Sequence, residues 1–306
     1  MRVAVLDDYQ NVALKLADWS AVETEAPITV FNDHLEGIEA VAERLHDFEI
    51  VVIMRERTPL PRALIEKLPN LKLLVTAGMR NLAIDLDAAS EHGVVVTGTK
   101  TLGYPVAEMT WGLLLALARH IPREDQATRE GEWQTSIGMA LNGKVLGVIG
   151  LGRVGSMVAR FGKAFEMEVI AWSRNLTDER CAEVGVRRAS KEELLTNADV
   201  ISVHVVLSDR TRGLIGANEL RMMKPTAYLV NTSRGPVVDE EALIEALRHR
   251  SIAGAALDVY ECEPLPADHP LRSLEHTVIS PHLGYVVEDN YRVIYGEAAE
   301  DVRAFL

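Results

Sequence analysis

Residues 145–155 read VLGVIGLGRVG, and this stretch decides how the chain folds. An apolar run that predicts a buried strand leads directly into the pattern G-x-G-x-x-G, and a helical pattern over residues 154–165 follows. Gly150 permits a tight turn, Gly152 lets backbone N–H groups approach a pyrophosphate, and Gly155 lets helix and strand pack closely. The stretch therefore predicts a dinucleotide-binding loop. The residues predicted to contact the dinucleotide here are Gly150, Gly152, Arg153, Val154 and Gly155.

On both sides of this loop, short apolar runs alternate with amphipathic helical patterns. This alternation predicts parallel sheets with helices on both faces. A longer helix is predicted over residues 105–120, where Pro105 occupies the first turn, and a C-terminal helix over residues 286–306. Five strands are predicted before the longer helix, at residues 3–6, 28–31, 50–54, 71–75 and 94–97; six follow it, at residues 145–149, 169–172, 200–203, 227–231, 252–259 and 277–280.

The length of the chain, 306 residues, exceeds what one hydrophobic core usually spans, so that two domains are expected. The six strands of the second series match a nucleotide-binding doubly wound sheet. The predicted fold class is therefore α/β, with two doubly wound parallel-sheet domains in tandem.

The charge balance argues against a nucleic-acid partner. The chain carries 32 Lys and Arg against 45 Asp and Glu, a net charge of −13, and no basic run stands out. A phosphate backbone would meet net repulsion. A small anionic substrate is still compatible with this charge, provided that a few arginines converge in one place.

The cysteines and the N-terminal sequence point to an intracellular protein without a metal site. Cys181 and Cys262 form no CxxC pattern and no histidine cluster accompanies them, so that we expect no bound metal and two reduced packing residues. Asp7 and Asp8 come before an apolar signal core could form, and no apolar run reaches about 18 residues. We therefore expect a cytoplasmic protein with no membrane partner.

The end of the second strand of the nucleotide-binding series indicates which cofactor is preferred. An NAD-selective site has a carboxylate there that accepts from the ribose 2′-hydroxyl. This chain has Ser173 and Arg174 instead, and an arginine can pair with a 2′-phosphate. Both residues are predicted to contact the cofactor, with NADP preferred over NAD. The alternative is that Arg174 is a solvated loop residue and either cofactor is accepted.

Three polar motifs follow predicted strands of the second series: NTSRG at residues 231–235, DVYECEP at residues 258–264 and SPHLG at residues 280–284. The carboxyl ends of parallel strands line the ligand crevice of an open α/β sheet, so that an Arg, a Glu and a His are expected to converge there. An Arg presents a planar fork to a carboxylate and a keto oxygen. A His donates a proton near neutral pH, and a carboxylate behind it holds its orientation.

Together with the glycine loop and with Val106-Ala107-Glu108, these motifs resemble those of the D-isomer-specific 2-hydroxyacid dehydrogenase family, which includes glyoxylate/hydroxypyruvate reductases and phosphoglycerate dehydrogenases. The resemblance covers nearly the whole chain. It implies an NAD(P)-dependent oxidoreductase that interconverts a small 2-keto acid and a D-2-hydroxy acid. It also implies a homodimer.

The resemblance further implies a flavodoxin-like substrate domain, formed by residues 1–100 and 285–306, and a Rossmann dinucleotide-binding domain over residues 101–284. In the catalytic site, Arg234 binds the 2-keto acid and polarises its carbonyl, His282 is the general acid/base, and Glu263 is the partner of His282. Thr232 and Asp258 are expected beside the cofactor, with Asp258 bonded to the nicotinamide carboxamide. Backbone N–H groups around Ala77, Gly78 and Met79 are expected to bind the substrate carboxylate.

The chain departs from the family pattern in places. His204-Val205-Val206-Leu207 stands where many members have His-x-Pro-Leu, which leaves the contacts of that loop with the cofactor open. The chain stops at Leu306 without the regulatory extension of some phosphoglycerate dehydrogenases, so that regulation of that kind is not expected.

For several residues near these motifs, the sequence allows more than one role. Glu261 competes with Glu263 as the partner of His282, although the family places the partner just before the proline. His204 is expected to be structural and Trp133 to be a packing residue. The arginines near the first-domain substrate loop are expected to be solvated rather than bound to an anion. These are Arg55, Arg57 and Arg80.

Two other functions compete with the dehydrogenase. A non-enzymatic dinucleotide sensor or corepressor is disfavoured because Arg234, Glu263 and His282 are all present. A formate-type enzyme is disfavoured because such enzymes usually have Gln in place of the partner carboxylate. Glyoxylate, hydroxypyruvate, a longer 2-keto acid and a phosphorylated one all share the unit that Arg234 and His282 would recognise, so that the choice among them stays open.

Overall fold

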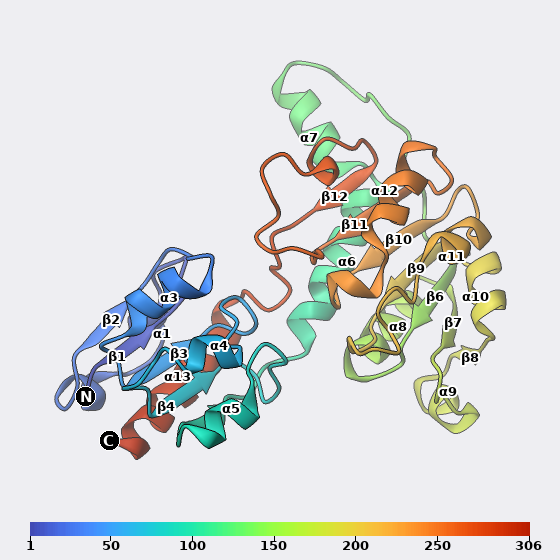
Figure 1. The fold of residues 1–306 in the computed structure, drawn as a ribbon. Coiled ribbons are helices and arrows are strands. Elements are labelled where there is room, and N and C mark those ends of the chain that lie inside the picture. The colour runs from blue at the N-terminus through green and yellow to red at the C-terminus, as the bar shows by residue number, and fades with distance from the viewer. The chain divides into compact units, whose positions relative to one another are not determined.

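The computed structural model describes all residues from 1 to 306. The chain divides into two compact units. Unit 1 consists of Met1–Leu102 together with Val286–Leu306, and unit 2 is Gly103–Tyr285. Each unit is an open parallel sheet covered by helices, which confirms the α/β fold class expected from the sequence (Figure 1).

Unit 1 is built on a five-stranded sheet in the order β2-β1-β3-β4-β5. This order is the flavodoxin-like one, in which the chain reverses direction across the sheet between β1 and β3. All neighbouring strands are parallel, and β3 and β4 are buried along their whole length. The strands are β1 (Val3–Val5), β2 (Ile28–Val30), β3 (Ile50–Ile53), β4 (Leu73–Thr76) and β5 (Val95–Gly98).

Helices pack on the sheet of unit 1. The C-terminal helix α13 (Glu288–Phe305) belongs to this unit and packs on β4. Its buried face includes Tyr291, Ile294 and Tyr295. The other helices of the unit are α1 (Ala13–Leu16), α2 (Ser20–Glu23), α3 (Ile38–Leu45), α4 (Arg62–Ile65) and α5 (Leu86–Glu91).

Unit 2 contains a seven-stranded parallel sheet in the order β12-β11-β10-β9-β6-β7-β8 (Figure 1). The sequence predicted six strands and missed β8 (Arg187–Arg188), because two exposed arginines carry no apolar pattern. The other strands are β6 (Val145–Ile149), β7 (Glu168–Trp172), β9 (Val200–Val203), β10 (Tyr228–Asn231), β11 (Gly254–Leu257) and β12 (Thr277–Ile279).

Side chains of the unit 2 sheet alternate between two buried faces, as the pleat of a strand requires. In β6, Leu146 and Val148 join the core under α6 and α8, whereas Ile149 joins the core under the helices of the opposite face. One face is covered by α6 (Tyr104–Ala118), α8 (Arg153–Ala164) and α9 (Asp178–Val184), the other by α10 (Lys191–Asn197), α11 (Ala217–Met222) and α12 (Glu240–Arg248). Two 3-10 turns, η1 (Gly235–Val237) and η2 (Pro270–Arg272), complete the unit.

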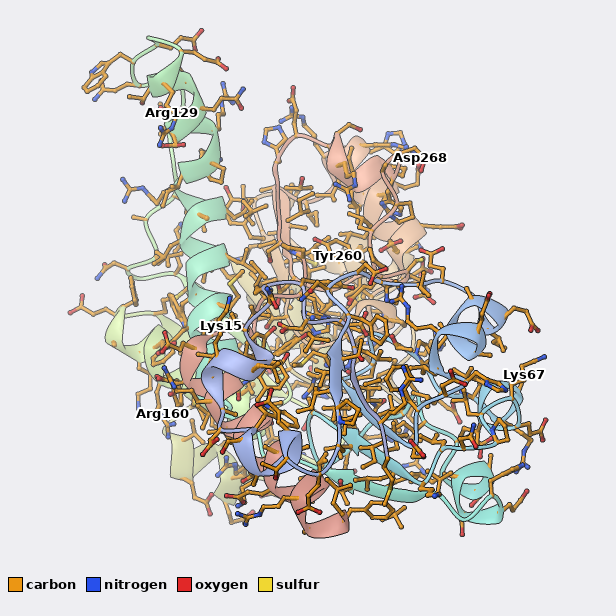
Figure 2. All side chains as sticks on the ribbon, turned by 90° about the vertical axis from the view of Figure 1, so that its left-hand side faces the viewer. Lys15, Lys67, Arg129, Arg160, Tyr260 and Asp268 are labelled. Atoms are coloured by element: carbon orange, nitrogen blue, oxygen red, sulfur yellow. The ribbon has the colours of Figure 1, made fainter.

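The long helix predicted over residues 105–120 ends at Ala118, and a further helix, α7 (Ile121–Arg129), follows it. The break has a local cause: His120 adopts a left-handed conformation, φ 52°, and Pro122 lies in the first turn of α7. A proline cannot donate to the preceding turn, so that it starts a new helix. Helix α7, with Arg129 at its end, extends beyond the sheet of its own unit (Figures 1 and 2).

Two packing predictions made from the sequence are wrong. Cys181 is buried as expected, but Cys262 is exposed, because it lies in the loop after β11 rather than in a strand or helix. Trp133 is 78% exposed, because the segment after α7 runs without regular structure. Among the helices, none combines the length and apolarity needed to cross a lipid bilayer.

Candidate active site

The glycine loop after β6 has the geometry that a pyrophosphate needs. Gly150 adopts φ 99°, which gives the tight turn, and a Cβ on Gly155 would lie only 2.0 Å from the carbonyl oxygen of Gly150. At Gly152, by contrast, a Cβ would meet nothing within 4 Å, so that the backbone is open on that side. Helix α8 begins directly afterwards at Arg153 and points its free N–H groups at this opening. The loop fits a dinucleotide.

Arg180 of α9 supports this loop, and sequence reasoning missed it. Its guanidinium donates to the carbonyl oxygen of Leu151 at 3.3 Å and to the Ser156 hydroxyl at 2.8 Å. Arg180 lies far from the glycine pattern along the chain, in a helix without a recognisable motif, so that only the folded arrangement reveals its contact. Arg153, the predicted loop residue, packs its side chain against Gly103.

At the end of β7, Ser173 is half-buried and Arg174 is exposed. The guanidinium of Arg174 makes no hydrogen bond and no ion pair with the chain. His204, at the end of β9, shares a 2.7 Å hydrogen bond between its Nε2 and the Ser202 hydroxyl. Burial lowers the pKa of His204 to about 3, so that this imidazole is neutral near pH 7 and its observed contacts are structural.

The three polar motifs follow three strands that are neighbours in the sheet. Arg234 comes after β10, Glu263 after β11 and His282 after β12. Because these strands are parallel and adjacent, their carboxyl ends lie at one edge of the sheet. The motifs are therefore brought to one edge although they are separated by many residues of sequence.

His282 and Glu263 form a close pair. Nδ1 of His282 lies 2.6 Å from Oε2 of Glu263, and Oε1 of the same carboxylate accepts the backbone N–H of Tyr260 at 2.9 Å. The carboxylate is thus held at both oxygens. Nε2 of His282 has no hydrogen-bond partner in the chain, so that it is the ring nitrogen left for a ligand. The alternative partner, Glu261, pairs with Arg212 at 3.0 Å instead.

Asp258 closes the loop that carries His282. One carboxylate oxygen accepts from the Ser280 hydroxyl at 2.5 Å and from the N–H of Leu283 at 2.8 Å, and the other accepts from the N–H of Gly284 at 2.8 Å. Burial raises the pKa of Asp258, while these hydrogen bonds act in the opposite direction. Within this closed loop, His282 adopts a left-handed backbone conformation, φ 54°.

The loop that carries Arg234 is shaped by Asn231. The side-chain amide of Asn231 donates to the carbonyl oxygen of Arg234, and its oxygen accepts both the N–H and the hydroxyl of Ser233. Thr232 is buried, and its hydroxyl lies 2.7 Å from that of Thr110 in α6. This contact ties the end of β10 to the long helix.

Two tyrosines contribute to the site, and sequence reasoning missed both. The buried Tyr260 hydroxyl donates to the carbonyl oxygen of Ser280 at 2.8 Å, and burial raises its pKa. Tyr285 is 5% exposed and packs edge-on against His282, with ring centroids 5.5 Å apart. An aromatic residue next to a polar motif gives no local sequence signal for such a contact.

In unit 1, the predicted substrate loop follows β4. Gly78 adopts φ 96° and its N–H donates to the Thr99 hydroxyl at 3.2 Å. The N–H of Ala77 donates to the carbonyl oxygen of Ile53 and continues the sheet, so that this donor is engaged within the unit. The N–H of Met79 has no partner in the chain.

The expectation that the three nearby arginines are solvated is wrong for two of them. Arg55 has a side chain that is only 17% exposed and whose guanidinium lies 3.0 Å from the position of a Cβ on Gly78. Arg57 donates to the carbonyl oxygen of Asp7 and stacks over the ring of Tyr9. The sheet brings these side chains together at the ends of β1, β3 and β4. Arg80 is exposed, as expected.

The fold and this site define the class of protein as an oxidoreductase with a Rossmann NAD-binding domain. Residues 111–284 match the family model "D-isomer specific 2-hydroxyacid dehydrogenase, NAD binding domain". The chain belongs to the D-isomer-specific 2-hydroxyacid dehydrogenase family, whose enzymes act on the CH–OH group of their donors with NAD. The family resemblance noted in the sequence is thereby confirmed.

Similar proteins have been named after two substrates. The glyoxylate reductase of Aeropyrum pernix is 41% identical over 79% of this chain and 75% of its own length. The D-3-phosphoglycerate dehydrogenase of Methanocaldococcus jannaschii is 37% identical over 99% of this chain, but the chain spans only 59% of that relative. A solved phosphoglycerate oxidoreductase from Vibrio cholerae superposes with a TM-score of 0.95 at 38% identity, covering 100% of this chain and 98% of that one.

Gly235 provides a test of how tightly the site is packed. A Cβ at this position would lie 1.9 Å from the carbonyl carbon and oxygen of Tyr260, and backbone atoms have no room to retreat. We expect Gly235→Ala to lower the stability of unit 2 by about 1–3 kcal/mol or more, because overpacking forces the two loops apart. Urea unfolding followed by circular dichroism measures this change.

Gly296→Ala in α13 is the matched control, because a Cβ there meets nothing within 4 Å. Alanine is about 1 kcal/mol better than glycine within a helix, so that this variant should be as stable as the parent or more stable. An unchanged unfolding midpoint for Gly235→Ala would show that the loops are not packed as described.

Proposed function

We propose that the chain reduces a small 2-keto acid to the D-2-hydroxy acid, and catalyses the reverse reaction, with glyoxylate or hydroxypyruvate as the preferred type of substrate. The observation that carries this proposal is the orientation of His282. Its Nδ1 is engaged by Glu263 at 2.6 Å while its Nε2 remains without a partner, at the sheet edge where the Arg234 loop also ends. A proton at Nε2 can then pass to a substrate oxygen.

Each of the three side chains has a distinct part in this reaction. A nicotinamide bound there would supply the hydride chemistry at the carbon that bears the oxygen. His282 donates its Nε2 proton to the developing alkoxide in reduction and takes it back in oxidation. Arg234 offers the fork of N–H donors that binds a carboxylate and stabilises negative charge on the keto oxygen. Glu263 keeps the imidazole oriented and compensates its positive charge.

For the cofactor, we propose that the glycine loop and the start of α8 bind the pyrophosphate, with Thr232 and Asp258 near the nicotinamide. Gly152 supports this placement, because nothing in the chain occupies the space beside it. Asp258 already accepts three hydrogen bonds from the His282 loop, so that a carboxamide donor would add to these rather than replace them. The exposed, unpaired Arg174 favours NADP over NAD.

For the substrate, we propose that unit 1 binds the carboxylate at the loop around Ala77, Gly78 and Met79, where the N–H of Met79 is the donor without a partner in the chain, with Arg55 as the nearby cation. Arg55 supports this because its guanidinium is held against Gly78 rather than left in solvent. The relatives are named glyoxylate reductase and D-3-phosphoglycerate dehydrogenase, so that a phosphoglycerate dehydrogenase-like activity is the second candidate. Both kinds of substrate carry the carboxylate–carbonyl or carboxylate–hydroxyl unit that Arg234 and His282 would contact.

The reaction is tested by the loss of nicotinamide absorbance with NADPH and NADH against glyoxylate, hydroxypyruvate, pyruvate and bulkier 2-keto acids. We expect His282→Ala to lower kcat by about 10²- to 10⁴-fold with cofactor binding retained, because the proton donor is lost. Glu263→Gln should lower kcat by about 10- to 100-fold, the equivalent of one charge-assisted hydrogen bond.

Glu261→Gln is the matched control for Glu263→Gln. It removes the same charge from the same loop, but Glu261 pairs with Arg212 and not with His282. Its kcat should stay close to that of the parent. Near-normal turnover of His282→Ala would refute the assignment of the proton donor, and tight cofactor binding without turnover on any substrate would refute the proposed reaction.

The cofactor preference is tested by Arg174→Ala. If Arg174 pairs with a 2′-phosphate, its loss should weaken NADPH binding by about 10- to 100-fold and leave NADH binding unchanged. Fluorescence titration with the two reduced cofactors measures both constants. Arg160→Ala, which removes an exposed charge of α8 labelled in Figure 2, should change neither. Equal affinities of the parent chain for NADPH and NADH would contradict the proposed preference.

We also propose a homodimer in which a second copy covers the segment around α7. Ile121 is 51% exposed, Trp133 is 78% exposed and Ile137 is 95% exposed on this segment, which extends beyond the sheet of unit 2 (Figure 1). Exposed apolar side chains that recur along one segment favour a protein interface over free solvent.

Sedimentation velocity over a range of concentrations tests the dimer. Ile137→Asp should shift the chain toward monomer, because a charge would be buried without a partner. Leu82→Asp, at a 75% exposed leucine of unit 1, is the control and should sediment like the parent. A monomeric parent chain at all concentrations would rule the proposal out.

A further inference from the structure

Unit 2 contains a cavity of about 570 Å³ that the proposed reaction does not use. It lies at the amino ends of four strands of the sheet. Lys144 precedes β6, Asp199 precedes β9, Tyr228 opens β10 and Ile252 lies just before β11, and all four residues line the cavity. The segment before β6 also contributes to its rim, through residues 137–139, so that the cavity borders the surface proposed above for the dimer.

The cavity and the candidate active site lie at opposite edges of one sheet. The residues proposed for catalysis and for cofactor binding follow the carboxyl ends of strands of this same sheet, namely β6, β7, β10, β11 and β12. Strands of four or five residues separate the two edges by roughly 13–17 Å. A ligand in the cavity would therefore not contact His282 or Arg234.

The cavity offers hydrogen-bond donors that the chain leaves unused. The ring of Tyr228 is buried and burial raises the pKa of this residue; its hydroxyl is accessible to solvent and has no partner in the chain. The ammonium group of Lys144 makes no hydrogen bond and no ion pair within 4 Å. Arg250 has a single contact with a carboxylate, 3.5 Å from Glu275.

The one acid in the cavity wall is already satisfied. Asp199 accepts the N–H of Val145 at 2.9 Å and an N–H of the Lys224 ammonium at 3.0 Å. Although burial acts against it, these hydrogen bonds and the charge of Lys224 lower the pKa of Asp199. The cavity wall thus carries more hydrogen-bond donors and positive charge than acceptors and negative charge. A ligand rich in hydrogen-bond acceptors would complement it.

The helix ends at this edge offer another explanation for its basic residues, but the observed contacts do not support that explanation. The helices of an α/β unit end at the amino edge of its sheet, where their partial negative charge attracts cations. The side chains of Lys144 and Arg250, however, donate to no helix carbonyl. The helix ends also do not account for the Tyr228 hydroxyl, which has no partner in the chain.

We propose that this cavity is a second ligand site, which binds a small organic anion. Its carboxylate or phosphate is held by Lys144, Arg250 and the Tyr228 hydroxyl. The remainder of the ligand packs on the apolar wall, which includes Met139 and Ile252. The volume is in the range of sites that bind small ligands, and the cavity is open to solvent on one side. The proposal does not depend on the reaction proposed above.

Isothermal titration with benzoate and with inorganic phosphate tests the site. Benzoate carries both a carboxylate and an apolar body, whereas phosphate carries the charge alone. The titrations are made on a chain that carries Arg234→Gln, so that anion binding at the candidate active site is reduced. We expect benzoate to bind one site, and more tightly than phosphate.

Two substitutions locate the bound anion. Lys144→Gln should weaken benzoate binding by about 10- to 100-fold, the value of one charge-assisted hydrogen bond. Tyr228→Phe keeps the ring and removes only the hydroxyl, and should weaken binding by about 2- to 10-fold. Lys163→Gln, an exposed lysine of α8, should have no effect.

Thermal unfolding of each variant checks that the fold is kept; Tyr228→Phe serves as the test if Lys144→Gln does not fold. Absence of benzoate binding, or binding that neither Lys144→Gln nor Tyr228→Phe weakens, overturns the proposal. Neither result bears on turnover of 2-keto acids, which is measured separately.

Discussion

The buried carboxylate of Asp258 is the group on which the candidate active site depends. An unsatisfied carboxylate in this position would be costly, and the only donors that satisfy it come from the segment of Ser280 to Gly284. That segment therefore has to close over Asp258. Closing it holds His282 in a left-handed conformation, which an L-residue seldom adopts without such support. The position of the imidazole is thus a consequence of satisfying a buried charge next to it.

The parallel sheet converts distant sequence motifs into neighbours. Arg234, Glu263 and His282 follow β10, β11 and β12, and the order of these strands in the sheet is also their order in the sequence. The loops then pack directly on one another. Gly235 lies so close to the backbone of Tyr260 that no side chain fits, and Tyr260 in turn supports the carbonyl of Ser280. Each loop is held by the next one, so that the site is stiff without metal ligands or disulfides in its framework.

The sequence predicted those parts of the structure that have a local pattern. The glycine loop, the alternating strands and the three polar motifs each imply their own geometry, and both sheets form as expected. Contacts that join distant segments were not predictable: Arg180 on the glycine loop, Tyr285 on His282, and Arg55 against Gly78. Strand β8 was missed for a related reason, since its pairing with β7 rather than an apolar period determines it. The break before α7 was missed although it has a local cause, Pro122 in the first turn of the new helix. Whether a loop residue such as Cys262 is exposed also depends on the whole fold, and its local sequence does not indicate it.

The two edges of the unit 2 sheet differ in how they can hold an anion. At the carboxyl edge, helices begin, and their free N–H groups bind a phosphate without any side chain, which is why glycines suffice in the loop at Gly150–Gly155. At the amino edge, helices end and present carbonyl oxygens, so that an anion there has to be held by side chains. Lys144, Arg250 and the Tyr228 hydroxyl are donors of this kind. Because mobile charged side chains are screened by salt more strongly than backbone groups in a closed loop, binding at the amino edge should be the weaker and the more salt-dependent of the two.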